Sequence, residues 1–184
     1  SFNNMLEDEF FSFLESRKNK LDGVAITGGE PLLQFGIVDF VRKIKALGFK
    51  VKLDTNGSFP ELLEQLIQEK LVDYVAMDIK NCKEKYPLTS GVENIEVSFI
   101  EQSVEYLLAD NVDYEFRTTY SPDLTNEDIE ELCKSIKGAK RYAIQKYRIP
   151  EGEQVVMMQR KSSDHDEAKI IAEKYVKSVI LRGM

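Results

Sequence analysis

The stretch Val24-Ala25-Ile26-Thr27-Gly28-Gly29-Glu30-Pro31 is a short apolar run that ends in two glycines. An apolar run of this length, bounded by turn residues, is typical of a buried strand. Beyond it, apolar residues recur at helical spacing and stop at Gly48, a residue type that commonly follows the end of a helix. The stretch therefore predicts a buried strand followed directly by an amphipathic helix.

The same strand-then-helix unit recurs along the chain. Further strands are expected at 49–53, 74–79, 114–120, 141–147 and, closing the chain, 178–181. Apolar residues at helical spacing fill the intervals, and one helix precedes the quoted strand. This alternation predicts an α/β fold with a parallel sheet and right-handed crossovers. Hydrophobic period alone leaves open whether the sheet is doubly wound or forms a full or partial (β/α) barrel.

Two local signals refine this outline. Thr125 and Asp128 resemble a capping box at the start of a helix. A polar loop is expected around 87–94, after the third strand.

The composition excludes several classes of protein. With 184 residues, of which 42% are hydrophobic, residues 1–184 are expected to form one domain with a real core. The formal net charge of −7 argues against attraction to nucleic acid or to anionic lipid. No apolar run approaches the roughly 20 residues of a membrane span, and no signal peptide is visible. A reduced cytoplasmic protein is therefore expected.

Metal sites built from cysteine or histidine are also limited by composition. The two cysteines, Cys82 and Cys133, cannot make a CxxC motif or a four-cysteine site, and there is a single histidine. Cys133 lies at an apolar helical position and is interpreted as a buried structural cysteine, and Cys82 as a free thiol in a polar loop. His165 is interpreted as a surface residue at the start of the last helix.

Polar residues follow three successive strands, and an α/β sheet usually places its site at these carboxyl-terminal ends. After the first strand, Gly28 and Gly29 let the backbone turn sharply and let a ligand approach the main chain. Glu30 then supplies a carboxylate that suits a ligand ammonium. A tight turn with an exposed glutamate is the alternative.

The second and third strand ends add further groups. Asp54 is followed by Thr55-Asn56-Gly57, which is either a plain turn or the place where the Asp54 carboxylate takes a cation, a hydroxyl or an amine. Asp78 and Lys80 are two residues apart and are expected to share one side of a strand. Such a carboxylate can take two ribose hydroxyls and such a lysine a ligand carboxylate. A weak surface ion pair is the alternative.

A fourth strand carries Arg117 near its carboxyl-terminal half. An inward arginine could bind a carboxylate or stack on a purine, and a structural salt bridge is the competing interpretation. Together the four strand ends predict a rim that suits a zwitterionic ligand with a sugar.

These motifs resemble those of radical S-adenosylmethionine enzymes. Gly28-Gly29-Glu30-Pro31, Asp54-Thr55-Asn56-Gly57 and Asp78-Ile79-Lys80 match the family in order and spacing. Within it, the chain resembles the activators of glycyl radical enzymes. The segments 116–122 and 143–147 are most similar to anaerobic ribonucleoside-triphosphate reductase activating proteins.

The resemblance implies a partial (β/α)6 TIM-like barrel of parallel strands, here without its first strand, that holds S-adenosylmethionine across its strand ends. It implies that the methionine amino group is held by Gly28, Gly29 and Glu30. The resemblance also implies that Asp78 binds the ribose hydroxyls and that Lys80 binds the methionine carboxylate.

The same resemblance assigns the remaining site residues. Asp54 and Thr55 would lie beside the methionyl end of the cofactor. A bound monovalent cation is one way in which these two residues could contact it. Arg117 would lie near the nucleoside.

One family motif is absent from this sequence. The family holds a [4Fe-4S] cluster with the three thiolates of a CxxxCxxC loop, and Cys82 and Cys133 cannot replace them. The chain begins with Ser1, at about the first helix of the family. We therefore expect an N-terminally incomplete domain, truncated or derived from a degraded gene, that cannot by itself cleave the cofactor.

The resemblance also implies a reaction and its partners. The parent protein would cleave S-adenosylmethionine reductively to methionine and a 5′-deoxyadenosyl radical. That radical would take a hydrogen atom from a glycine of a partner, a glycyl radical enzyme. An external electron donor such as flavodoxin or ferredoxin is the second expected partner, and neither nucleic acid nor a membrane is expected.

Three alternatives stay open. The chain could belong to a pyruvate formate-lyase activating enzyme, which shares the first three motifs almost as well. It could belong to another radical S-adenosylmethionine enzyme acting on a small molecule or peptide, although its short length counts against this. It could also be a non-catalytic nucleoside-binding domain, which the missing cysteines would favour.

Overall fold

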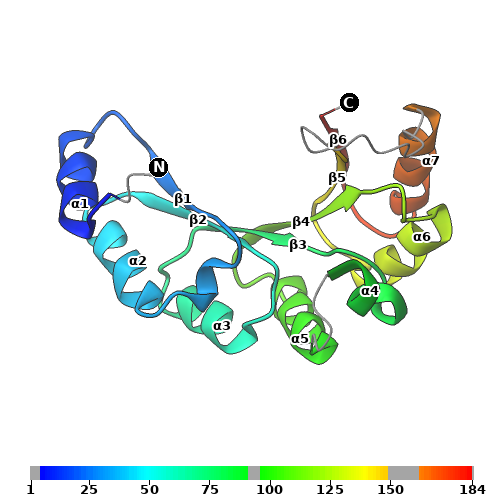
Figure 1. The fold of residues 1–184 in the computed structure, drawn as a ribbon, viewed down its shortest axis with the longest axis horizontal. Helices are drawn as coiled ribbons and strands as arrows, with labels where there is room; N and C mark the ends of the chain where they lie inside the picture. Colours follow the sequence, from blue (N-terminus) through cyan, green and yellow to red (C-terminus); the bar gives the residue numbers. More distant parts are fainter. Residues whose placement is uncertain (1–4, 91–95, 149–161, 184) are drawn as a thin grey trace.

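The centre of the molecule is a six-stranded parallel sheet whose strand order follows the chain. The computed structural model describes residues 5–90, 96–148 and 162–183. The strands are β1 (Gly23–Ile26), β2 (Lys50–Thr55), β3 (Tyr74–Asp78), β4 (Asp113–Tyr120), β5 (Tyr142–Lys146) and β6 (Val179–Arg182). Figure 1 shows the sheet curled into an open arch, with β1 and β6 at its two ends. The expected partial barrel of parallel strands is thereby confirmed.

The helices lie along the outer, convex side of this arch (Figure 1). They are α1 (Glu7–Ser16), α2 (Ile37–Ala46), α3 (Pro60–Gln68), α4 (Tyr86–Ser90), α5 (Val97–Leu108), α6 (Asn126–Ser135) and α7 (Ser162–Ala172), with short 3-10 turns η1 (Pro31–Leu33) and η2 (Lys83–Lys85). None of the helices in the described ranges is long and apolar enough to cross a membrane.

The core forms where the sheet meets the helices. Side chains on a strand alternate between its two faces, and most of those that point toward the helices are apolar. Six of them are at most 1% exposed: Val51, Leu53, Val75, Met77, Phe116 and Ile144. The intervening residues, Asp54, Asp78 and Arg117 among them, point to the concave face. The sheet therefore has an apolar outer face and a polar inner face.

Two predicted helix boundaries are confirmed in atomic detail. Gly48 follows α2 with a φ of 91°, a backbone conformation that glycine adopts without strain. At the start of α6, the Thr125 hydroxyl accepts a hydrogen bond from the Asp128 amide (3.2 Å), and the Asp128 carboxylate accepts one from the Thr125 amide (3.0 Å). This reciprocal pair is the capping box that the sequence indicates.

Two sequence-based expectations were wrong. The segment beginning at Tyr86 is a short helix, α4, and not a loop, because Tyr86 is 2% exposed and anchors it to the core. The rest of the expected loop, 91–94, lies outside the described residues. His165 is not a surface residue: it is 4% exposed, and its ring meets Tyr120 edge-on with centroids 5.4 Å apart. Its charged neighbours misled the prediction, since successive helical residues face different directions.

Candidate functional site

The turn after β1 is held from the inside by Glu30. Gly28 has a φ of 148°, which favours glycine, and leads the chain into η1. Glu30 is only 8% exposed, and its carboxylate accepts hydrogen bonds from the amides of Leu32 (3.0 Å) and Asn56 (2.7 Å). The alternative of an exposed glutamate is therefore wrong: the carboxylate is turned inward and joins the β1 turn to the β2 turn.

The turn after β2 is equally well fixed. The Thr55 hydroxyl lies 3.0 Å from both carboxylate oxygens of Glu30 and accepts a hydrogen bond from the Gly57 amide (3.1 Å). Ser103 of α5 donates to the Gly57 carbonyl (2.8 Å). Gly57 has a φ of 77°, and a Cβ there would lie 2.1 Å from the terminal methyl carbon of Met77, so both the backbone and its neighbour favour glycine.

The concave face carries an array of charges at the ends of β2 and β3 and in the middle of β4. Arg117 Nε lies 2.7 Å from Asp78 Oδ1, and its Nη1 lies 3.3 Å from Asp54 Oδ2. Burial works to lower the pKa of Arg117, but the hydrogen bond to Asp78 and the charges of both carboxylates outweigh it, so the pKa is raised. The sequence predicted that these three residues share a rim, and the structure brings them together.

Lys80 does not join this array. Pairing continues just beyond β3, where the Ile79 amide donates to the Arg117 carbonyl (2.8 Å). The Lys80 ammonium, however, donates to the Ser90 carbonyl at the end of α4 (3.2 Å). The Asp78 side chain keeps 46% of its surface exposed. Asp78 and Lys80 thus lie at the same strand end without pairing with each other.

Sequence reasoning missed three further charged residues on the concave face. Lys52 forms an ion pair with Asp54, and the two-residue spacing that linked Asp78 to Lys80 could have found it. The guanidinium of Arg182 in β6 donates two hydrogen bonds, 2.8 and 2.7 Å long, to the carboxylate of Glu115 in β4. No sequence signal joins these two, because they are far apart along the chain and meet only across β5.

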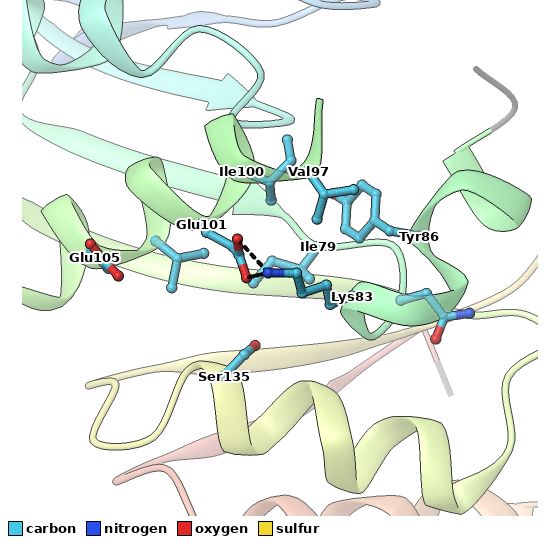
Figure 2. Close-up of a pocket in the computed structure, with 10 residues that line it drawn as sticks. Ile79, Lys83, Tyr86, Val97, Ile100, Glu101, Glu105 and Ser135 are labelled. Atoms are coloured by element: carbon cyan, nitrogen blue, oxygen red, sulfur yellow. Dashed lines mark hydrogen bonds and ion pairs between the residues drawn. The ribbon is translucent and has the colours of Figure 1, made fainter. Parts of the chain in front are cut away.

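Open space borders the sheet in two places. A cleft of about 630 Å³ runs along 24–31, the β1 strand and its glycine turn, and is bordered by Phe10 and Phe40. A smaller pocket of about 230 Å³ lies on the helical side, between α5 and the η2–α4 segment, where Lys83 and Glu101 form an ion pair (Figure 2). Of these two, the cleft is the one that adjoins residues that the sequence singled out for binding, Gly28, Gly29 and Glu30.

The two cysteines are free thiols and lie apart from the strand-end array. Cys82 is 7% exposed at the start of η2, and Cys133 is fully buried in α6. Burial raises the pKa of Cys133 to about 12. Within the residues that the structure describes, no group of three or more histidine, cysteine, aspartate or glutamate side chains could hold a metal ion.

Solved structures share this fold at low sequence identity. A domain of a pyruvate-formate lyase-activating enzyme from Bacteroides vulgatus superposes with a TM-score of 0.66 at 15% identity, covering 88% of this chain and 99% of that one. Streptococcus suis SuiB bound to S-adenosylmethionine gives a TM-score of 0.72 at 17% identity, covering 98% of this chain and 44% of that one. At these identities the likeness shows the fold alone.

Sequence comparison goes further. A Methanocaldococcus jannaschii protein assigned by name to the glycyl-radical enzyme activating enzymes is 36% identical over 170 residues, 88% of this chain and 70% of that protein. A 7-carboxy-7-deazaguanine synthase of Koribacter versatilis is 32% identical over 119 residues, 64% of this chain and 50% of that protein. This chain thus spans 70% and 50% of the lengths of these two relatives. The family model of the Radical SAM superfamily matches residues 2–136. The chain belongs to the radical S-adenosylmethionine superfamily.

Proposed function

We propose that this chain binds S-adenosylmethionine across its strand ends, as the binding core of an enzyme that activates a glycyl radical enzyme. The observation that carries the proposal is the charge array on the concave face, in which Arg117 lies between Asp54 and Asp78. Hydroxyls, an ammonium and a carboxylate are the polar groups that S-adenosylmethionine presents. Acidic and basic side chains at adjacent strand ends are suited to bind them.

The residues present fit the nucleoside half of the ligand. Asp78 binds Arg117 through Oδ1 and remains 46% exposed, so its carboxylate can still accept ribose hydroxyls. Arg117, held at the bottom of the site with 12% of its side chain exposed, lies near the nucleoside. We therefore assign Asp78 to the ribose hydroxyls and Arg117 to the neighbouring part of the nucleoside.

The methionyl half falls to the other strand ends. Lys80 is exposed and bonded only to a carbonyl in the described contacts, so its ammonium can bind the ligand carboxylate. The main chain at Gly28 and Gly29 faces open space, where the amino group can approach carbonyl oxygens. Asp54 and the Thr55 turn lie beside this end. Bound there, S-adenosylmethionine would supply the 5′-deoxyadenosyl radical that takes a hydrogen atom from glycine, once an electron from the donor has cleaved its C5′–S bond and released methionine.

The iron–sulfur cluster of the family does not fit the residues present. Such a cluster needs three thiolates, whereas this sequence has two cysteines, both buried and on separate elements. The roles assigned to this chain are therefore binding and orientation, not delivery of an electron.

The finer identity of the partner rests on resemblance. The name of the Methanocaldococcus relative supports a glycyl radical enzyme as partner, and the motifs at 116–122 and 143–147 favour anaerobic ribonucleotide reductase over pyruvate formate-lyase. We further propose a flavodoxin or ferredoxin as electron donor to the whole protein. The two free thiols fit the reducing cytoplasm in which we place it.

Two other functions each have one supporting observation. Similarity to 7-carboxy-7-deazaguanine synthases favours a radical enzyme that acts on a small molecule. The burial of both cysteines favours a nucleoside-binding domain without radical chemistry.

Calorimetric titration with S-adenosylmethionine tests the proposal. The unmodified chain should bind, and Asp78→Ala should raise the dissociation constant at least tenfold, since hydrogen bonds to a charged acceptor contribute about 1.5–3 kcal/mol. Glu101→Gln, which breaks the surface pair with Lys83 on the helical side, is the matched control and should bind normally. Absence of binding at millimolar ligand, or normal binding by Asp78→Ala, would contradict the proposal.

The choice of partner needs a separate measurement. We expect the chain to bind anaerobic ribonucleotide reductase more tightly than pyruvate formate-lyase when each is titrated in the presence of S-adenosylmethionine. A preference for pyruvate formate-lyase would move the assignment to that activator without affecting the ligand site.

A further inference from the structure

The carboxylate of Glu30 is hydrogen-bonded to groups of the protein itself. Its Oε1 accepts from the Leu32 amide (3.0 Å), its Oε2 accepts from the Asn56 amide (2.7 Å), and the Thr55 hydroxyl lies 3.0 Å from both oxygens. With 8% of the residue exposed, these internal donors replace water around the charge. The charged carboxylate of Glu30 thus has its hydrogen-bond partners within the protein.

The partners of Glu30 come from two different turns. Leu32 belongs to η1, which follows β1, whereas Thr55 is the last residue of β2 and Asn56 follows it. The hydroxyl of Thr55 extends the connection, because it also accepts from the Gly57 amide (3.1 Å). A chain of hydrogen bonds therefore runs from the β2 turn through Thr55 into Glu30 and on to the β1 turn.

Thr55 points away from the concave face. Asp54, its neighbour on β2, reaches Arg117 on that face, and successive strand residues point to opposite sides. Thr55 is 2% exposed. It therefore has no surface to offer a ligand on the concave face, yet it is hydrogen-bonded directly to Glu30.

We infer that Glu30 is a positioning residue. Its carboxylate ties the β1 turn to the β2 turn, and this tie aims the main chain of Gly28 and Gly29 at the ligand amino group that Glu30 itself does not contact. The ligand half of the inference rests on the proposed function; the tie between the turns does not.

Glu30→Gln and Thr55→Val separate this role from direct contact. A glutamine presents an N–H₂ group where the carboxylate now accepts an N–H, and a valine removes the hydroxyl at nearly constant volume. Thr55→Ser keeps the hydroxyl and is the matched control. Two readouts are taken: amide hydrogen exchange at Asn56, followed by NMR, and the dissociation constant of S-adenosylmethionine, followed by calorimetry.

A positioning role makes the two variants behave alike. Each should speed amide exchange at Asn56 and raise the dissociation constant of S-adenosylmethionine by about tenfold or more. The double variant Glu30→Gln/Thr55→Val should bind no more weakly than Glu30→Gln alone. Thr55→Ser should keep the exchange rate and the dissociation constant close to those of the unmodified chain. Unaltered exchange at Asn56 in Glu30→Gln overturns the tie. A Thr55→Val chain that binds normally, while Glu30→Gln loses binding, shows direct contact and overturns the positioning role.

These readouts also keep the two proposals apart. If the unmodified chain does not bind S-adenosylmethionine, the proposed function fails, and the tie is decided by exchange at Asn56 alone. Circular dichroism of every variant confirms that the fold is retained before either readout is interpreted.

Discussion

Arg117 and Asp78 are direct partners in the register of β3 and β4, and their side chains meet on the concave face with Nε 2.7 Å from Oδ1. The same guanidinium reaches Asp54 on β2, so one positive charge serves carboxylates from two strands. The order of strands in the sheet, and not proximity along the chain, creates this contact.

Removal of that positive charge should destabilise the fold. In Arg117→Met, the carboxylates of Asp54 and Asp78 lose the cation between them. We expect the free energy of unfolding, measured by urea denaturation, to fall by about 2 kcal/mol, less than the roughly 3–5 kcal/mol of a fully buried pair. Arg117→Lys should recover part of the loss. An Arg117→Met chain as stable as the unmodified one would contradict this account.

Stability should fall in acid because of Glu115. Burial works to raise the pKa of Glu115, but the hydrogen bonds and charge of Arg182 outweigh it and lower the pKa. Since the folded pKa lies below the unfolded one, the stabilisation is complete above the ordinary carboxyl pKa and is lost as the pH falls through the folded value. Urea denaturation at a series of pH values should show a weaker acid dependence for Glu115→Gln than for the unmodified chain.

A surface glutamate controls for general acid effects. Glu131 pairs with Lys134 on the exposed side of α6, so Glu131→Gln should keep the acid dependence of the unmodified chain. If Glu115→Gln and Glu131→Gln give the same profile, the acid sensitivity does not come from the buried pair.

Gly57 should be far less replaceable than another glycine of similar backbone conformation. Gly57 and Gly138 have φ values of 77° and 89°, but a Cβ at Gly57 would meet buried Met77 at 2.1 Å, whereas a Cβ at Gly138 has nothing within 4 Å. Gly138→Ala should cost about 1 kcal/mol through backbone strain alone. Gly57→Ala should cost about 2 kcal/mol or more in addition, through the clash. Equal losses in thermal denaturation would show that Met77 can move aside.

Tyr86 offers a stabilising substitution. Its hydroxyl is buried and makes no hydrogen bond of good geometry among the described residues, and burial raises its pKa to about 12 although the main chain of Lys80 works to lower it. Because an unsatisfied buried polar group costs about 1–3 kcal/mol, Tyr86→Phe should leave the free energy of unfolding unchanged or raise it by about 1 kcal/mol. A clear loss of stability in chemical denaturation would reveal a bond that the hydroxyl does make.

The sequence was sufficient to predict the order of elements, because each strand is a short apolar run closed by turn residues and each helix shows its own period. It also identified Asp54, Asp78 and Arg117 as neighbours, since parallel strands bring their carboxyl-terminal ends to one edge. The identity of Glu30 as a strand-end acid was visible, but its inward orientation depends on which amides the two turns present to it. No spacing rule reports that.

Contacts between residues on different strands and helices were the other feature that the sequence did not predict. The pairing of Glu115 with Arg182 needs β6 to lie two strands from β4, and the burial of His165 needs α7 to pack against the end of β4. Both depend on which elements lie next to each other in space, and the hydrophobic period of a single element does not encode this. That residues 1–184 form a single domain stays a prediction.

The polar concave face has a consequence for how this sequence can change over generations. Parallel sheets are normally covered by apolar layers on both faces. Here the concave face can be exposed to water because its charges are paired across strands, as in Glu115 with Arg182 and Arg117 with two aspartates. A single substitution there leaves the opposite charge without its partner. Sequence changes on this face should therefore occur as compensating pairs, while the apolar face accepts single conservative exchanges.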